Sequence, residues 1–217
     1  SLVNKKYDVT VVDTFKFSEN TLNHILHSTN LDVIRKDVRS LDKAFLQKFD
    51  CIIPLSAIVG APACNLYHKE ATSVNKESIK MIADSISNNQ LLIYPTTNSG
   101  YGSTTGEMHC DELTPLNPIS HYGILKKEAE DIVMDRVNSI CFRMATVFGT
   151  SPRPRTDLLV NDFVHKAYFD KSIVLFESHF KRNYIHVRDV AKAYLFAISN
   201  FDNLKSEIFN LGLSNAN

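Results

Sequence analysis

Five short apolar runs alternate with longer segments of helical spacing, and this alternation constrains the fold more than any other feature of the sequence. The apolar runs lie at residues 7–12, 31–35, 49–55, 90–94 and 139–147. They are nearly continuous rather than alternating with polar residues, as expected for strands buried on both faces. Segments 63–87, 120–136 and 189–198 place apolar residues three and four apart and are predicted helices. Strands that alternate with helices predict an α/β protein with a doubly wound parallel sheet.

Composition and charge exclude several classes of function. The 24 Lys and Arg residues balance 24 Asp and Glu residues, so the chain lacks the excess of positive charge typical of nucleic-acid or anionic-membrane binding. No apolar run approaches the ~20 residues that span a bilayer. The four cysteines form no CxxC pair, which argues against a disulfide framework or a zinc site and suits a reducing cytoplasm. We therefore expect a cytoplasmic protein with no metal, no nucleic-acid partner and no membrane partner.

Tyr122 and Lys126 are the first candidates for chemistry. They stand four residues apart on a predicted helix that Ser120 could cap, so their side chains project on one face. A free phenol has a pKa near ~10, and a neighbouring ammonium favours the phenolate. That arrangement would let Tyr122 act as a general acid and base near neutral pH. Without further context, an exposed lysine beside a packed tyrosine is an equally good interpretation.

Polar residues at the ends of two predicted strands supply that context. Residues 96–99 (TTNS) follow the run at 90–94, and Asp13 follows the run at 7–12. In doubly wound sheets, ligands bind beyond the carboxyl ends of the strands, and an aspartate there can accept hydrogen bonds from two ribose hydroxyls. A polar turn and an ordinary turn aspartate are the alternatives to this interpretation.

Four short motifs occur in a fixed order along the chain. Residues 96–102 (TTNSGYG) form a Ser/Thr-rich strand end that closes on Tyr-Gly, and residues 122–126 (YGILK) form a Tyr-x-x-x-Lys motif. Residues 143–149 (RMATVFG) and 182–189 (RNYIHVRD) follow. Together these motifs resemble the extended short-chain dehydrogenase/reductase family, in its NAD-dependent nucleotide-sugar epimerase/dehydratase branch. The resemblance covers nearly the whole chain.

The resemblance implies a domain division and a set of roles. It implies an NAD-binding Rossmann-like domain over residues 1–150 and 184–202, and an incomplete small substrate-binding cap over 151–183 and 203–217. The implied catalytic residues are Thr97, which hydrogen-bonds the reacting sugar oxygen, Tyr122, the acid/base, and Lys126, which holds the nicotinamide ribose and lowers the tyrosine pKa. The implied cofactor contacts are Asp13, Asp37, Val38, Leu55, Ser56, Ala57, Asn75, Tyr122, Lys126 and Met144. The implied substrate contacts are Thr97, Thr146 and Arg182.

Two side chains refine the implied ligands. The carboxylate of Asp13 would repel a 2′-phosphate, which favours NAD over NADP. The planar fork of Arg182 suits the paired anionic oxygens of a sugar nucleotide. Arg153, Arg155 and Asn161 could contact phosphate or sugar, or could equally be solvated loop residues.

The implied reaction is the removal of a hydride from a sugar carbon of a nucleotide sugar and its return, which defines an epimerase. Asn98 and Ser99 stand where the dehydratases of this branch carry an acidic pair, so dehydration is not expected. An NAD(P)-dependent reductase of a 4-keto nucleotide sugar is the alternative enzyme, and a non-catalytic cofactor-sensing or scaffold protein is the alternative of another class. The resemblance also implies a homodimer through the helices at 63–87 and 120–136.

Glycine is scarce at the start of the chain. The seven glycines amount to about 3%, against roughly 7% on average, and none lies in the first 59 residues. The glycine turn of the family would precede Asp13, whereas residues 1–6 are all that precede the first apolar run. Residues 210–217 resemble a strand and turn midway through the substrate domain. The chain therefore looks like a fragment, and we expect it to bind NAD weakly or not at all because the pyrophosphate would lose its main anchor.

Overall fold

Parallel strands form the framework of the protein. The computed structural model describes residues 2–102, 110–176, 178 and 182–213. The central sheet has the order β3–β4–β5–β8, with bounds Cys51–Ile52, Leu91–Thr97, Ser139–Met144 and Glu207–Leu211. Two further parallel pairs join β1 (Val9–Asp13) to β2 (Leu31–Arg35) and β6 (Thr146–Phe148) to β7 (Tyr184–His186). The predicted α/β class with parallel strands is confirmed, although the strands form three hydrogen-bonded groups rather than one sheet.

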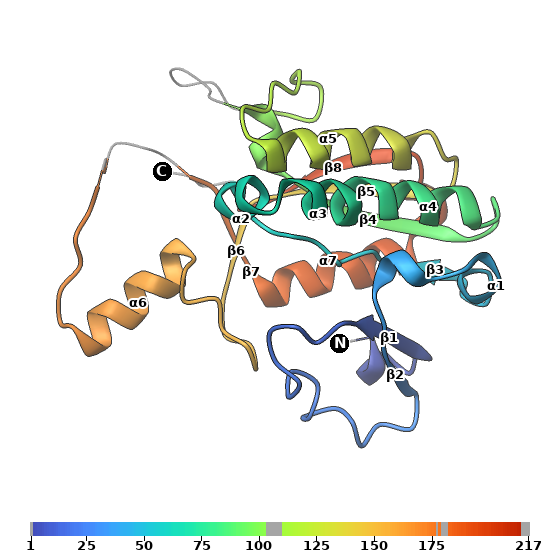
Figure 1. The fold of residues 1–217 in the computed structure, drawn as a ribbon, viewed down its shortest axis with the longest axis horizontal. Coiled ribbons are helices and arrows are strands. Elements are labelled where there is room, and N and C mark those ends of the chain that lie inside the picture. The colour runs from blue at the N-terminus through green and yellow to red at the C-terminus, as the bar shows by residue number, and fades with distance from the viewer. Residues whose placement is uncertain (1, 103–109, 177, 179–181, 214–217) are drawn as a thin grey trace.

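Helices cover both faces of the central sheet, as a doubly wound arrangement requires (Figure 1). On one face lie α2 (Ala61–Leu66), α3 (His68–Thr72), α4 (Ser78–Ser85) and α5 (His121–Met134), and α7 (Val187–Ser199) lies on the other. The remaining α-helices are α1 (Lys43–Leu46), α6 (Leu159–Phe169) and α8 (Phe201–Leu204). Single 3₁₀ turns are η1 (Val3–Lys5), η2 (Val38–Ser40) and η4 (Asn98–Tyr101), and η3 (Ser73–Glu77) is a π-helical turn. Among the described residues, no helix combines the length and the apolar character needed to cross a membrane.

The continuous apolar strands arise because both faces of the sheet are buried. Successive side chains of a strand point to opposite faces, and in β4 Leu92 and Tyr94 join the cluster beneath α4 and α5 while Ile93 joins the cluster beneath α7. β5 divides in the same way, with Cys141 on the first face and Phe142 on the second. The sheet thus lies between two apolar layers, which explains why the sequence of these strands shows no polar alternation.

The helix predicted over residues 63–87 is interrupted in the structure. Tyr67 leaves the helical region of backbone space between α2 and α3, and the chain then passes through η3 before α4 begins. Asn75 lies in η3 with its side chain fully buried, and its amide bonds the backbone of Ile58. A π turn of this kind often marks a functional site. Apolar spacing alone could not reveal it, because the turns on either side remain helical.

Strand β8 corrects the implied domain division. Residues 203–217 were assigned to the cap, but Glu207–Leu211 pairs with β5 throughout and extends the central sheet. Ile208 packs against the cluster beneath α4 and α5, and Phe209 and Leu211 pack against the cluster beneath α7. This alternation buries both faces of β8 partly and makes it an edge strand of the core.

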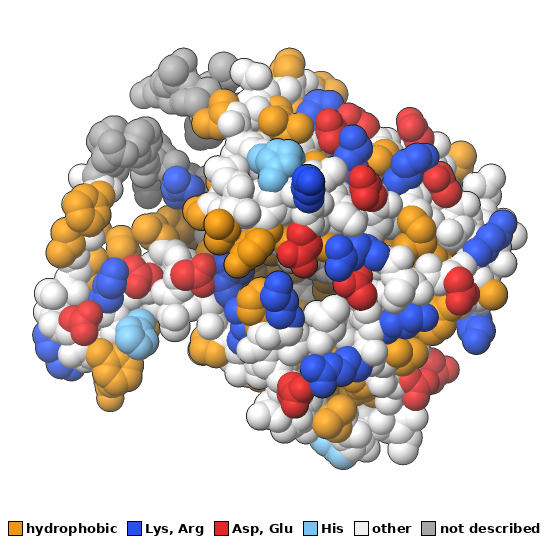
Figure 2. Space-filling view, viewed as in Figure 1, with side chains coloured by type: hydrophobic (Ala, Val, Ile, Leu, Met, Phe, Trp, Pro, Cys, Tyr) orange, Lys and Arg blue, Asp and Glu red, His pale blue; other side chains and the backbone are white. Residues whose placement is uncertain are grey.

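The surface differs between the body of the protein and α6. On the face shown in Figure 2, Lys and Arg side chains are interspersed with Asp and Glu, in keeping with the zero net charge. Helix α6 stands away from the sheet, and none of its residues is buried (Figures 1 and 2). Its exposed apolar side chains include Val164, Tyr168 and Phe169. The assignment of residues 151–183 to a substrate-binding cap stays a prediction.

Candidate active site

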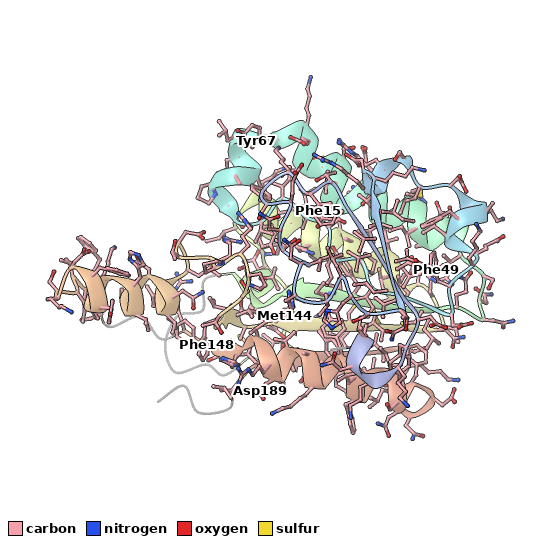
Figure 3. The ribbon with its side chains drawn as sticks, turned by 90° about the horizontal axis from the view of Figure 1, so that it is seen from below. Phe15, Phe49, Tyr67, Met144, Phe148 and Asp189 are labelled. Atoms are coloured by element: carbon pink, nitrogen blue, oxygen red, sulfur yellow. The ribbon has the colours of Figure 1, made fainter. Side chains whose placement is uncertain are left out.

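The carboxyl ends of β4 and β5 lie side by side. Thr97 and Met144 form the last register pair between these strands, and Met144 also pairs with Leu211 of β8. In Figure 3, Phe15, which follows β1, and Met144 both lie to the left of Phe49, which precedes β3. Thr97 and Met144 therefore share the carboxyl edge of the central sheet, at which parallel sheets of this kind bind ligands.

The chain turns sharply after Thr97. The Thr97 hydroxyl accepts a hydrogen bond from the backbone N–H of Ser99 (3.2 Å) and caps η4. Gly102 ends the turn with φ +74°, and a Cβ at this position would overlap the carbonyl oxygen of Asn117. Only glycine satisfies both conditions, so the Ser/Thr-rich motif closes on Tyr-Gly for a steric reason.

Gly123 brings the helix of Tyr122 against that turn. Ser120 caps α5 by accepting a hydrogen bond from the Gly123 N–H (3.1 Å), as the sequence predicted. A Cβ on Gly123 would lie 3.0 Å from the Pro118 Cβ and 3.2 Å from the carbonyl oxygen of Ser99. Because glycine has no Cβ, the first turn of α5 packs tightly against η4, which is the turn that Thr97 caps.

Tyr122 packs into an apolar cluster with Ile58, Cys64 and Leu125. Burial raises the pKa of the Tyr122 phenol to about 12, the neighbouring Cys64 thiol raises this pKa further, and the Arg155 guanidinium lowers it. Tyr122 is therefore protonated at neutral pH in this state. In this structure Arg155 supplies the positive charge that opposes the rise, and the expectation that Lys126 lowers the Tyr122 pKa stays a prediction.

The ammonium of Lys126 is directed into the protein interior. The side chain is buried, and its Nζ donates to the Tyr94 hydroxyl (3.0 Å) and to the Pro95 carbonyl oxygen (2.9 Å). Burial lowers the pKa of Lys126 to about 8 because the charged form loses its hydration. An ammonium has three N–H donors, and the described residues accept from two of them.

The carboxylates implied in cofactor binding have different surroundings. One carboxylate oxygen of Asp13 accepts the backbone N–H of Phe15 (2.7 Å), and the other accepts no hydrogen bond from the described residues. Both oxygens of Asp37 bond the guanidinium of Arg39, which lowers the pKa of Asp37. The side chain of Val38 packs against the core beneath α4. Asp13 thus has a free acceptor, whereas Asp37 is already paired.

Asn75 fixes the loop that carries Leu55, Ser56 and Ala57. Its Oδ1 accepts the N–H of Ile58 (2.8 Å) and its Nδ2 donates to the carbonyl oxygen of the same residue (2.8 Å). These two bonds pair the N–H and the carbonyl oxygen of Ile58, as hydrogen bonds from a neighbouring β-strand would. Leu55 remains exposed in this loop, and Ser56 and Ala57 are half-buried. Asn75 therefore shapes the loop, and its implied contact with the cofactor stays a prediction.

The implied substrate contacts lie at β6 and β7. Thr146 opens β6, and its backbone N–H donates to the carbonyl oxygen of Asn183, next to Arg182. Arg182 is exposed, and within the described part of the chain it forms no ion pair or hydrogen bond. Arg155, whose role was left open, forms a bidentate pair with Asp157 (2.7 and 2.6 Å) and acts on Tyr122.

Sequence reasoning missed a buried ion pair behind the Thr97 strand end. Glu130 accepts two hydrogen bonds from Nε of Arg143 and one from Nη2, and the hydroxyl of Thr96 donates to Glu130 (2.7 Å). Both charged side chains are nearly inaccessible to solvent. Arg143 also donates to the Tyr101 hydroxyl (3.0 Å) and so ties β5 to η4. The sequence signal that could have revealed this pair was the charged Arg143 within an apolar strand, together with Glu130, four residues after Lys126 on the same face of α5.

The geometry thus combines a parallel-sheet edge with a threonine turn, a tyrosine and a buried lysine on adjoining elements. Comparison with known proteins identifies the class. Residues 1–212 match the NAD dependent epimerase/dehydratase family, and the chain belongs to this family of enzymes.

Individual relatives agree with this assignment. UDP-arabinose 4-epimerase 1 of Arabidopsis thaliana is 27% identical over 249 residues, covering 97% of this chain and 58% of the plant protein. UDP-glucuronic acid 4-epimerase of Bacillus cereus, solved with UDP-glucuronic acid and NAD, shares the fold with a TM-score of 0.83 at 21% identity, over 99% of this chain and 72% of that one. A dTDP-glucose 4,6-dehydratase of Streptomyces venezuelae, solved with NAD and TYD, has a TM-score of 0.79 at 18% identity, over 95% and 67%. The chain spans 48–58% of the plant 4-epimerases that it matches.

Proposed function

We propose that this chain carries the catalytic centre of an NAD-dependent nucleotide-sugar epimerase that acts at C4 of the sugar. The observation that carries the proposal is the close packing of α5 against η4 at Gly123, which brings the element of Tyr122 to the turn of Thr97. The 4-epimerase names of the relatives support the position of reaction. Asn98 and Ser99, in place of an acidic pair, support epimerisation over dehydration.

The residues present fit NAD. Asp13 offers an unpaired carboxylate oxygen for a ribose, and Lys126 retains an N–H donor beyond its bonds to Tyr94 and Pro95. We propose that the cofactor lies between them and contacts the loop of residues 55–57, the backbone near Asp37 and Val38, and Met144. When bound, NAD supplies the hydride acceptor and donor that epimerisation needs. Weak binding by the 217-residue chain itself stays a prediction.

Proton transfer is the task of the chain's own residues. In the proposal, Tyr122 accepts the proton of the sugar hydroxyl and returns it, and the Thr97 hydroxyl holds the same oxygen in place. With a Tyr122 pKa of about 12, ionising the phenol at neutral pH costs about 7 kcal/mol, from roughly 1.4 kcal/mol per pH unit. A catalytic base works best with a pKa near the operating pH. The substrate-bound state therefore requires the positive charge of Lys126 or Arg155 closer to the phenol.

Substitution of the tyrosine tests the proposal. Tyr122→Phe removes the proton acceptor and preserves the ring, so we expect turnover of UDP-sugars to be abolished while binding persists. Tyr7→Phe, at a site remote from Thr97 and Lys126 in the sequence, is the control and should retain turnover. Product formation is followed by NMR of the sugar with UDP-glucose, UDP-arabinose and UDP-glucuronic acid in parallel. Turnover by Tyr122→Phe at the wild-type rate would refute the assignment.

The alternative functions are separated in the same experiment. An epimerase returns the hydride, so the absorbance of the reduced cofactor shows no net change during turnover. A 4-keto reductase consumes reduced cofactor in proportion to product. A cofactor sensor or scaffold would bind NAD without forming product from any of the three sugars. We also propose that the protein acts as a cytoplasmic homodimer through the helices within residues 63–87 and 120–136, which light scattering of the purified protein would test.

A further inference from the structure

The surroundings of Lys126 contain no opposite charge among the described residues that could balance its ammonium. Its hydrogen-bond acceptors are the neutral Tyr94 hydroxyl and the Pro95 carbonyl oxygen. The ammonium also lies 4.4 Å from the centroid of the Tyr94 ring, within the range of a cation–π attraction. Tyr94 therefore supplies two of the three contacts that hold this buried charge.

The hydroxyl of Tyr94 is oriented by a second partner. It accepts the Lys126 N–H, and it donates its own hydrogen to the backbone carbonyl oxygen of Asn75 over a long 3.5 Å bond. Asn75 belongs to the π-helical turn η3, and its side chain clamps Ile58. The hydrogen bonds thus form a directed chain, in which Lys126 donates to Tyr94 and Tyr94 donates to Asn75. This order presents a lone pair of Tyr94, rather than its hydrogen, to the ammonium.

Packing alone does not require a hydroxyl at position 94. Tyr94 is almost completely buried in an apolar cluster whose other members near it, such as Leu92 and Ala129, are aliphatic. Tyr194, on the other face of the sheet, is also a buried tyrosine, and its hydroxyl has no hydrogen-bond partner within the described part of the chain. Tyr94 and Tyr194 therefore form a matched pair of buried tyrosines: the hydroxyl of the first bonds the Lys126 ammonium, and that of the second has no partner among the described residues.

We propose that Tyr94 is a positioning residue that keeps Lys126 protonated and fixes its ammonium against the end of β4. Only the catalytic consequence of this proposal rests on the proposed function. The hydrogen bond between Tyr94 and Lys126 is a contact within the protein and does not depend on that function. Through Asn75, the same hydroxyl connects Lys126 to the loop that is proposed to line the cofactor path. Tyr94 touches neither substrate nor cofactor in this assignment and acts through the lysine.

The other titratable groups near this pair remain neutral or paired. Cys64 of α2 and Cys141 of β5 face Lys126, and burial raises the pKa of both thiols. Tyr122 of α5 and Glu130 of the same helix face Tyr94, and Glu130 is paired with Arg143. Tyr194 also acts on Tyr94 from the opposite face of the sheet. Lys126 is therefore the group of this cluster that we expect to titrate first above neutral pH.

The test is the titration of Lys126 in the purified protein, followed by NMR of isotope-labelled lysine side chains. Wild type, Tyr94→Phe and the control Tyr194→Phe are compared, and Lys126→Met assigns the resonance. Tyr94→Phe keeps the ring but removes the acceptor, so we expect the midpoint of Lys126 to fall by about one pH unit, a tenfold loss of proton affinity. Tyr194→Phe should leave the midpoint unchanged. An unchanged midpoint in folded Tyr94→Phe overturns the proposal.

A double variant keeps the proposal testable if Tyr94→Phe does not fold. Adding Lys126→Met removes the charge that Tyr94 is proposed to hold, so folding should return in Tyr94→Phe/Lys126→Met. Failure of the double variant to fold would assign Tyr94 a packing role and overturn the proposal. Turnover supplies the catalytic readout, with the pH profile of Tyr94→Phe shifted to lower pH relative to wild type. A shifted lysine midpoint in a protein that turns over no UDP-sugar would refute the proposed function and leave this inference standing.

Discussion

Burial of Lys126 makes a quantitative prediction about stability and pH. Burial lowers the pKa of this lysine from its ordinary 10.5 to about 8, so between these values the folded protein binds fewer protons than the unfolded chain. The free energy of unfolding therefore rises with pH across this window. Below pH 8, burial of the charged lysine lowers the free energy of unfolding by its full amount. The difference of 2.5 pH units, at roughly 1.4 kcal/mol each, amounts to about 3 kcal/mol.

Lys126→Met isolates this penalty. Methionine is unbranched and of similar length, so it fills the same space without a charge. The variant lacks the hydrogen bonds to Tyr94 and Pro95, which lowers its free energy of unfolding by a constant ~1–3 kcal/mol at every pH. The difference in unfolding free energy between variant and wild type should therefore favour the variant by about 3 kcal/mol more at pH 7 than at pH 10.5. The change across the window, rather than the value at one pH, is the quantity that the structure predicts.

Urea unfolding followed by circular dichroism at intervals from pH 6.5 to pH 10.5 measures this change. Lys127→Met is the matched control because Lys127 lies on the same helix and pairs with Asp131 at the surface. Exposed pairs of this kind contribute little, so the control should differ from wild type by less than ~1 kcal/mol with no trend across the window. A Lys126→Met difference that stays constant from pH 7 to pH 10.5 would refute the assignment of a buried, destabilised ammonium.

Two further substitutions test how the site is assembled. Gly123→Ala places a Cβ 3.2 Å from the Ser99 carbonyl oxygen, so we expect urea unfolding to show a free energy of unfolding lower by about 1–3 kcal/mol, with a larger loss of turnover. Gly100→Ala is the control. Its Cβ meets only the flexible end of a leucine, so it should lose less stability and less turnover. Glu130→Gln leaves Arg143 buried without its counter-charge, and thermal and urea unfolding should show destabilisation of about 3–5 kcal/mol. A stability equal to wild type in Glu130→Gln would contradict the burial of that pair.

The parts of the fold that could be predicted are those set by local pattern. Continuous apolar runs identified the strands around Leu92 and Phe142, because burial on both faces favours apolar residues at successive positions. Helical spacing placed Tyr122 and Lys126 on one face of α5. The shortness of β3 was not foreseen, although Pro54, which has no N–H to donate, follows it closely. Strand β8 was assigned to the cap because residues 210–217 resemble a strand and turn of the substrate domain, and its pairing with β5, which lies far away in the chain, leaves no local signature.

The partners of each site residue could not be predicted, because they depend on contacts between elements. The spacing of Tyr122 and Lys126 suggested that the ammonium lowers the pKa of the phenol. The structure instead directs Lys126 to Tyr94, which lies 32 residues earlier in the chain. The π turn that buries Asn75 and the pairing of Glu130 with Arg143 depend in the same way on the packed sheet. Sequence motifs identified the participants, whereas packing decided which of them interact.

Burial acts on Tyr122 and Lys126 in opposite directions, and this determines the resting state of the site. In water, a phenol with a pKa of about 10 and an ammonium with a pKa of about 10.4 compete almost equally for a proton. In the structure, the pKa of Tyr122 is about 12 and that of Lys126 is about 8. The four-unit gap makes the tyrosinate–ammonium pair about 5 kcal/mol less stable than the neutral pair. An attraction between two opposite charges about 4 Å apart is worth about 4 kcal/mol at an effective dielectric constant of ~20, which recovers most of this gap. In the proposed mechanism, the base form of Tyr122 therefore depends on a bound state in which the charge of Lys126 or Arg155 approaches the phenol, and a ligand that brings the charges together would control the reactivity of the site.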